Sequence, residues 1–221
     1  MERKNTVLLT VIAVATLLVA VVGATFAYFT ASTANGGAGE SASVTTTTVG
    51  DVELNMSTVT TSNDLDYPGG FLVVGAKVEA TADSGSYATT YTVNGTVSNN
   101  TRTALNWTLY ERSSVVANPV AGCDLKETAA AGETQYYYEG CNVTALTEGA
   151  TKVDEGTVTA GSETTAGSAT IAAAGETLDT GASTYYYLVV EYPNGGNQDA
   201  DQGKTITASL TSVSNGTATA K

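Results

Sequence analysis

Residues 184–192, with the sequence Thr-Tyr-Tyr-Tyr-Leu-Val-Val-Glu-Tyr, decide the fold class of this chain. β-branched and aromatic residues dominate the run, and both kinds favour extended backbone. In a strand the large side chains would alternate between two faces: Tyr186, Leu188, Val190 and Tyr192 on one, Tyr185, Tyr187 and Val189 on the other. A strand that is apolar on both faces is typical of the centre of a covered sheet.

Nine further strand-like runs occur before and after this one in the sequence, and turn-forming residues such as Pro68-Gly69-Gly70 separate them. They cover residues 43–49, 52–56, 71–80, 89–97, 104–111, 135–138, 152–158, 169–173 and 205–213. Leu105, Trp107 and Leu109 share one face, which predicts that Trp107 is in the core and that Asn106 and the similarly placed Asn94 face solvent. We therefore predict an all-β jelly roll or antiparallel β-sandwich.

The composition limits the functions that this chain could have. Its 221 residues suit one all-β domain, and 22 acidic against 9 basic residues give a net charge of −13. Nucleic acid is not an expected partner, because phosphate binding needs clustered Lys and Arg. The chain has no histidine, which removes most zinc and acid-base sites, so we expect no enzyme, no catalytic residues and no cofactor.

The N-terminus has the order of a secretory signal. Arg3 and Lys4 precede an apolar run over 7–22, and small residues at Thr25 and Ala27 place a cut between Ala27 and Tyr28. We expect a signal peptide at 1–27, a flexible glycine-rich arm at 28–42 and the β-sandwich at 43–221. Signal peptidase and the translocon would be partners during export to the cell surface or beyond, whereas an uncut helix would hold the protein on the membrane.

Two cysteines and six glycosylation sequons suit an exported protein. Cys123 and Cys141 are expected to form a disulfide, and closing a loop of this length should stabilise by about 3 kcal/mol. The sequons begin at Asn55, Asn94, Asn99, Asn106, Asn142 and Asn215. A chain rich in Thr and Asn also produces sequons by chance, so they are only possible glycosylation sites.

Two other groups of residues carry weak signals. Asn197, Asp199 and Asp201 alternate in a loop and could gather oxygen ligands for Ca²⁺, although a polar loop tip explains them as well. The tyrosine triplets at 136–138 and 185–187 could contact carbohydrate or protein, or could be strand residues divided between core and surface.

The N-terminal junction resembles that of the TasA and camelysin family, exported with a SipW-type signal peptide. The matching residues are Gly23-Ala24-Thr25-Phe26-Ala27-Tyr28-Phe29-Thr30. The Tyr67-Pro68-Gly69-Gly70 turn with Asp83-Ser84-Gly85-Ser86, and residues 186–207, are similar to two further stretches of that family. Residues 119–180 are not, and are interpreted as an insertion or elaboration. The resemblance implies a jelly roll and biofilm-matrix fibres in which the N-terminal strand of one subunit completes the sheet of the next.

We therefore expect a structural fibre subunit whose main partner is itself. The expected donor strand consists of Tyr28, Phe29, Thr30, Ala31, Ser32, Thr33 and Ala34. A strand added to an open sheet edge satisfies backbone groups that would otherwise stay unpaired. The alternatives are a monomeric adhesion or binding domain held by an uncut helix, and a pilin-like filament with that helix at its centre.

Overall fold

The computed structural model describes residues 45–49, 52–63, 65, 67–82, 85–130, 133–162, 164–174, 177–195, 199–201 and 203–221. These residues belong to one compact unit, residues 40–221. The expected signal peptide at 1–27 and the arm at 28–42 lie outside the described residues.

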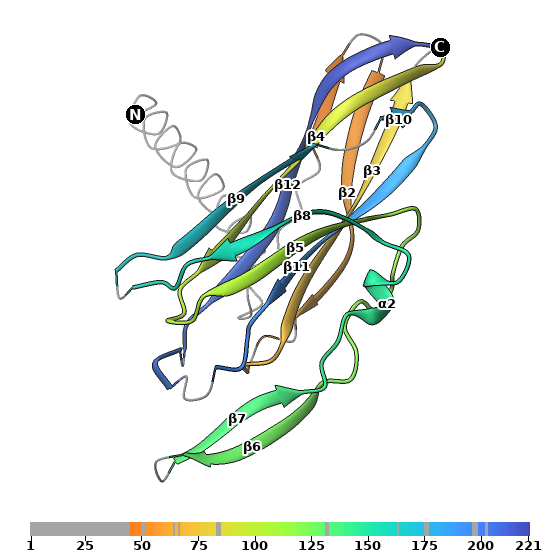
Figure 1. Cartoon of the computed structure of the whole chain (residues 1–221). Helices are drawn as coiled ribbons and strands as arrows, with labels where there is room; N and C mark the ends of the chain where they lie inside the picture. The colour runs from red at the N-terminus through yellow and green to blue at the C-terminus, as the bar shows by residue number, and fades with distance from the viewer. Residues whose placement is uncertain are drawn as a thin grey trace, which may run out of the picture. The chain divides into compact units, whose positions relative to one another are not determined.

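The described residues form two antiparallel sheets that pack together and a separate hairpin (Figure 1). The larger sheet has the order β1 (Thr45–Val49), β2 (Val52–Asn63), β3 (Phe71–Ala82), β11 (Ser183–Glu191), β5 (Leu105–Arg112) and β8 (Thr151–Val158). In the smaller sheet β4 (Tyr87–Asn99) pairs with β12 (Ile206–Ala220) on one side and with β9 (Gly167–Ala174) and β10 (Leu178–Asp179) on the other. The hairpin consists of β6 (Asp124–Ala130) and β7 (Glu133–Glu139). The predicted all-β sandwich is confirmed.

The strand of residues 184–192 is central, as predicted. It forms β11, which pairs with β3 on one side and β5 on the other. Alternate residues of these strands are buried between the two sheets, among them Leu72, Val74, Leu105, Leu109, Leu188 and Val190. Trp107 is buried with them, 7% exposed, and its ring lies so close to Gly156 that a Cβ there would be 2.9 Å from it.

The opposite face of β3 and β11 is covered by the segment that joins β5 to β8. Leu146, from the short helix α2 (Thr144–Thr147), is fully buried against Val73, Tyr187 and Val189. Arg112 holds this helix, because its Nη1 donates to the carbonyl oxygens of Leu146 at 2.5 Å and of two neighbouring residues. Both faces of the central strands are therefore buried.

The elaboration expected over residues 119–180 divides into two parts. β8 and β9 are edge strands of the two sheets, since β8 pairs with β5 and β9 with β4. The β6–β7 hairpin, α2 and their connections stand outside the sandwich sheets. Residues 119–180 therefore include strands that belong to the two main sheets.

Candidate functional site: the open edge of the smaller sheet

Four edges of the two sheets are candidates for pairing with another chain. The larger sheet ends at β1 and β8, and the smaller sheet ends at β12 and at β9 with β10. An edge strand exposes a row of backbone N–H and C=O groups, and charges, bulges or covering segments normally prevent it from binding further strands.

Charge protects the β8 edge. Lys152, Asp154 and Glu155 all lie in this eight-residue strand, and Lys152 Nζ is 2.8 Å from Glu155 Oε1. The pairing of β8 with β5 is also irregular, with a register shift between Leu109 and Tyr110. An added strand would have to accommodate these charges and this irregularity.

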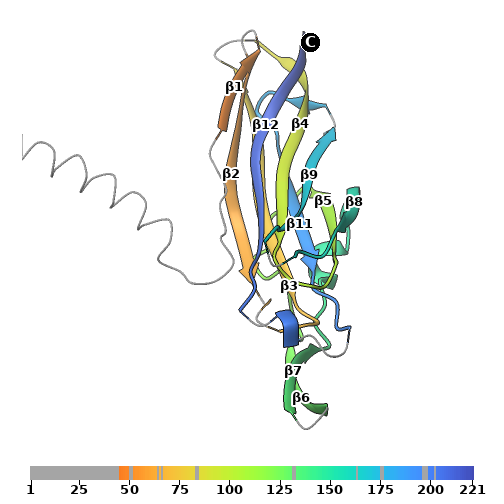
Figure 2. The same cartoon turned by 90° about the vertical axis from the view of Figure 1, so that its left-hand side faces the viewer.

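Bulges protect the β12 edge, and β1 and β12 lie beside each other, which hinders access to both edges. β12 has register shifts between Leu210 and Ser212 and between Asn215 and Ala218. β1, only five residues long, lies alongside β12 where the two sheets meet (Figure 2). Bulges and a neighbouring strand both hinder the docking of a straight donor strand.

The β9 edge lacks the charge of β8 and the register shifts of β12, and it is longer than β1, although part of β8 lies beside it. Its sequence, Gly-Ser-Ala-Thr-Ile-Ala-Ala-Ala, contains no charge and no proline, and all eight residues pair with β4 without a register shift. Within the described part of the chain, β4 is its only sheet partner. Ile171 and Ala173 are buried against the core, whereas Thr170 and Ala172 are exposed. β9 is thus an uncharged edge of eight residues, paired with β4 without a bulge.

A buried amide holds the connection that leads into β9. Asn99, at the end of β4, is fully buried, and its Nδ2 donates to the carbonyl oxygens of Thr103 at 2.8 Å and Thr159 at 3.1 Å. Its Oδ1 accepts from the backbone N–H and the hydroxyl of Thr101. The Thr101 carbonyl in turn accepts from Gly161 N at 2.6 Å. These bonds tie the chain between β8 and β9 to the end of β4, where the pairing of β4 with β9 begins.

This arrangement corrects the suggestion that Asn99 is a glycosylation site. A glycan would attach to Nδ2, which is buried and already donates two hydrogen bonds. Asn106 and Asn142 are exposed, as expected for Asn106, and Asn55 and Asn94 are half-buried. Asn215 lies in β12 opposite Tyr91. Sequence reasoning missed the Asn99 network because a sequon does not reveal whether its asparagine is buried.

Asp201 does not have the environment expected of a loop-tip calcium ligand. Its carboxylate is buried and accepts hydrogen bonds from Thr103 Oγ1 at 2.7 Å, Tyr192 OH at 2.9 Å and Arg102 N. Burial, with the bond to Asp201, raises the pKa of Tyr192. Asp199 lies in the same short helix, η1 (Asp199–Asp201), and Asn197 is outside the described residues. The prediction of Asp201 as a loop-tip calcium ligand is therefore wrong, because its carboxylate ties η1 to the turn after β4.

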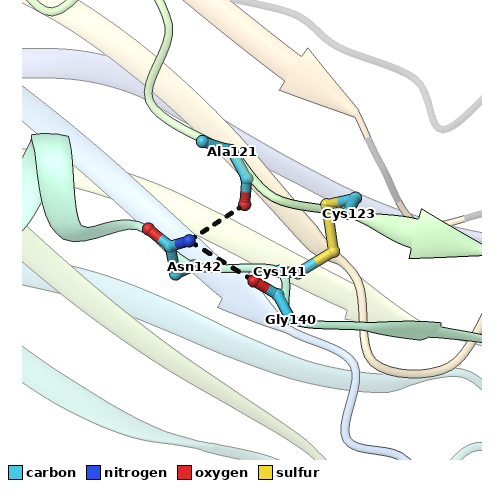
Figure 3. Close-up of a disulfide and its surroundings, with 5 residues drawn as sticks. All are labelled: Ala121, Cys123, Gly140, Cys141 and Asn142. Carbon is cyan, nitrogen blue, oxygen red and sulfur yellow. Dashed lines mark hydrogen bonds between the residues drawn. A yellow bond between two sulfur atoms is a disulfide. The ribbon is translucent and has the colours of Figure 1, made fainter.

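The predicted disulfide is present. Cys123 and Cys141 are joined with an S–S distance of 2.06 Å at the base of the β6–β7 hairpin (Figure 3). Beside it, Ala121 and Asn142 exchange two backbone hydrogen bonds of 3.0 and 2.9 Å. Gly122 and Gly140 have φ of 73° and 78°, a left-handed conformation that glycine adopts without strain.

The two tyrosine triplets have different environments. Tyr186 and Tyr187 are fully buried and Tyr185 is half-buried, so this triplet belongs to the covered central strand. In the other triplet Tyr136 is exposed, and its ring packs against that of Tyr67 with centroids 5.8 Å apart.

The expected cleavage site at Ala27 and Tyr28, and donor residues 28–34, lie outside the described residues. No helix in the described part of the chain is both long and apolar enough to cross a membrane. The chain matches no known family model, no curated protein and no solved structure.

Proposed function

We propose that this chain is an exported structural subunit of a cell-surface or extracellular-matrix fibre. In the proposed assembly, residues 28–34 of one subunit add as a strand to β9 of the next. The single observation that carries the proposal is the β9 edge, which is uncharged, eight residues long and paired without a register shift, whereas β8 is charged, β12 is bulged and β1 has only five residues.

The composition of the arm supports this pairing. Residues 28–34 contain no charge and are nearly as long as the eight-residue β9. The protein as a whole carries a net charge of −13, so copies repel each other over most of their surfaces. Pairing two uncharged segments avoids that repulsion, and the new backbone hydrogen bonds and the Tyr28 and Phe29 side chains would supply the affinity.

Two further features support an extracellular structural role. The Cys123–Cys141 disulfide suits an oxidising compartment. The described polar clusters at Asn99 and Asp201 are fully engaged in internal hydrogen bonds and connect strands to loops. In the proposed role these clusters stabilise the subunit, and the protein carries out no catalysis.

The test is electron microscopy of the protein expressed behind its own leader, with and without residues 28–34. The proposal expects filaments from the parent chain, and folded monomers from the deletion variant with an intact cleavage signal. Filaments from the deletion variant would rule out the arm as the donor. A parent protein that stays monomeric on the membrane would favour the anchored adhesion domain instead.

A further inference from the structure

The β6–β7 hairpin projects beyond one end of the sandwich in both views (Figures 1 and 2). Leu125 lies opposite Tyr138 and Glu127 opposite Tyr136, so these four residues share one face of the hairpin. Tyr67, from the turn before β3, packs on the same rings, with its centroid 5.6 Å from that of Tyr138 and 5.8 Å from that of Tyr136. We call Tyr67, Leu125, Glu127, Tyr136 and Tyr138 the tyrosine face.

The tyrosine face leaves large apolar side chains partly exposed to solvent. Leu125 is 50% exposed and Tyr136 is 45% exposed. The only other large hydrophobic residue exposed to this degree in the described part of the chain is Val115. Exposed apolar side chains gathered on a projecting surface are a candidate interaction site.

The hairpin is held in place although it stands outside both sheets. A two-stranded hairpin alone is marginally stable in water. Here the Cys123–Cys141 bond closes its base, and Tyr138 N donates to Pro68 O at 2.7 Å. Gly69 packs so closely on Tyr138 that a Cβ would lie 2.2 Å from the Tyr138 carbonyl oxygen. The tyrosine face is therefore ordered before binding, which lowers the entropy cost of binding a ligand.

Charge and size select the kind of ligand. The hairpin carries Asp124, Glu127, Glu133 and Glu139 against Lys126, so an anionic polymer would be repelled. Strands of seven residues are roughly 24 Å long, and a two-stranded face is roughly 10 Å wide. Its footprint is well below the approximately 800 Å² that each partner of a stable protein complex buries. An extended chain molecule without negative charge suits a narrow face of this size better than a globular protein.

We propose that the tyrosine face binds a neutral glycan chain. The rings of Tyr67 and Tyr136 pack against the C–H faces of sugar rings, and the Glu127 carboxylate accepts hydrogen bonds from sugar hydroxyl groups. This binding does not require fibre assembly. If subunits do form a fibre, each presents one such face, and repetition along the fibre multiplies a weak affinity.

The experiment uses the whole exported protein and three soluble probes: cellohexaose and chitohexaose as neutral glycans, and hexa-arginine as a basic peptide. Binding is measured by calorimetry. We expect at least one neutral hexasaccharide to bind, Tyr136→Ala to weaken it at least tenfold, and Glu127→Gln to weaken it severalfold. Val115→Ala, which removes an exposed apolar side chain outside the tyrosine face, should leave binding unchanged.

Because Tyr136 is 45% exposed and lies outside the core, Tyr136→Ala should melt close to the parent, which separates lost binding from unfolding. If Tyr136→Ala does unfold, Tyr136→Phe and Glu127→Gln carry the test, with Glu127→Gln again expected to weaken binding. The proposal is overturned if neither hexasaccharide binds the parent protein, or if hexa-arginine alone binds. Unchanged binding by folded Tyr136→Ala and Glu127→Gln variants would also overturn it.

Discussion

The hydroxyl groups of Tyr91 and Tyr186 lie 2.7 Å apart and join the two sheets through a buried hydrogen bond. The rings meet edge to face, with centroids 6.2 Å apart and planes at 81°. Tyr91 comes from the smaller sheet and Tyr186 from the centre of the larger one, so this pair fixes how the two sheets face each other.

Removing either hydroxyl should destabilise the sandwich. We expect Tyr91→Phe and Tyr186→Phe each to lower the free energy of unfolding by about 1–2 kcal/mol, because each leaves a buried polar group with one fewer partner. The double variant should cost less than the two single variants together, since both remove the same bond. Urea unfolding of the oxidised protein measures all three, and strictly additive losses would show that the hydroxyls do not interact.

Stability should decrease at alkaline pH. Burial, as the main cause, raises the pKa of Tyr186, Tyr187 and Tyr192 in the folded protein. Above the ordinary tyrosine pKa of about 10 the unfolded chain loses protons that the folded chain keeps. The contribution of these tyrosines to the free energy of unfolding is therefore complete below that pH and is lost as the pH rises above it. The slope is about 1.4 kcal/mol per pH unit for each such tyrosine.

Tyrosine absorbance at 295 nm, followed with circular dichroism, tests this dependence. Part of the tyrosine signal should appear only when the fold is lost, and Tyr186→Phe should make stability less dependent on pH. Complete titration near pH 10 of a protein that is still folded would contradict the burial of these three hydroxyls.

The Asn99 amide should be among the most sensitive polar positions. Asn99→Ala removes a donor to Thr159 O, one of two donors to Thr103 O and the acceptor for Thr101, and we expect a loss of about 2–3 kcal/mol in unfolding free energy. Asn106→Ala, at an exposed sequon, is the matched control and should change stability by less than about 0.5 kcal/mol. Equal melting temperatures for the two variants would disprove the structural role of Asn99.

Trp107 tests the packing of the core. Trp107→Ala should cost about 3–5 kcal/mol, as for other large-to-small changes in a core. Trp107→Phe fills much of the same volume and should cost clearly less. If Trp107→Ala melted within a degree or two of the parent, the side chain would not be a core residue.

The sequence was sufficient to predict the strands with a clear apolar pattern. The run at 104–111 became β5 because its apolar residues alternate with polar ones. The run at 184–192 became β11 because it is apolar on both faces, which suits the centre of a covered sheet. β6 was missed, because its residues Asp-Leu-Lys-Glu-Thr-Ala-Ala show little alternation and are held mainly by pairing with β7 and the disulfide. Asn99 and Asp201 looked like surface residues because their partners are distant in sequence or are backbone groups, which a local pattern does not reveal.

The β9 edge could not be identified from sequence either. Its residues predict a strand, but whether that strand lies at an edge depends on pairing with β4, a segment far away in the sequence. Only the arrangement of strands shows that the charged β8 and the uncharged β9 are both edges.

The central claim, that β9 receives a strand from another subunit, is tested most directly by a pair of proline substitutions, Ala169→Pro and Ala172→Pro. Successive N–H groups of a strand point to opposite sides, so one of these two residues directs its N–H away from β4. Proline at that residue preserves the pairing with β4, removes a donor and obstructs an added strand. The measurement is electron microscopy of whichever variant melts like the parent. The account predicts folded protein without filaments, and normal filaments from that variant would contradict it.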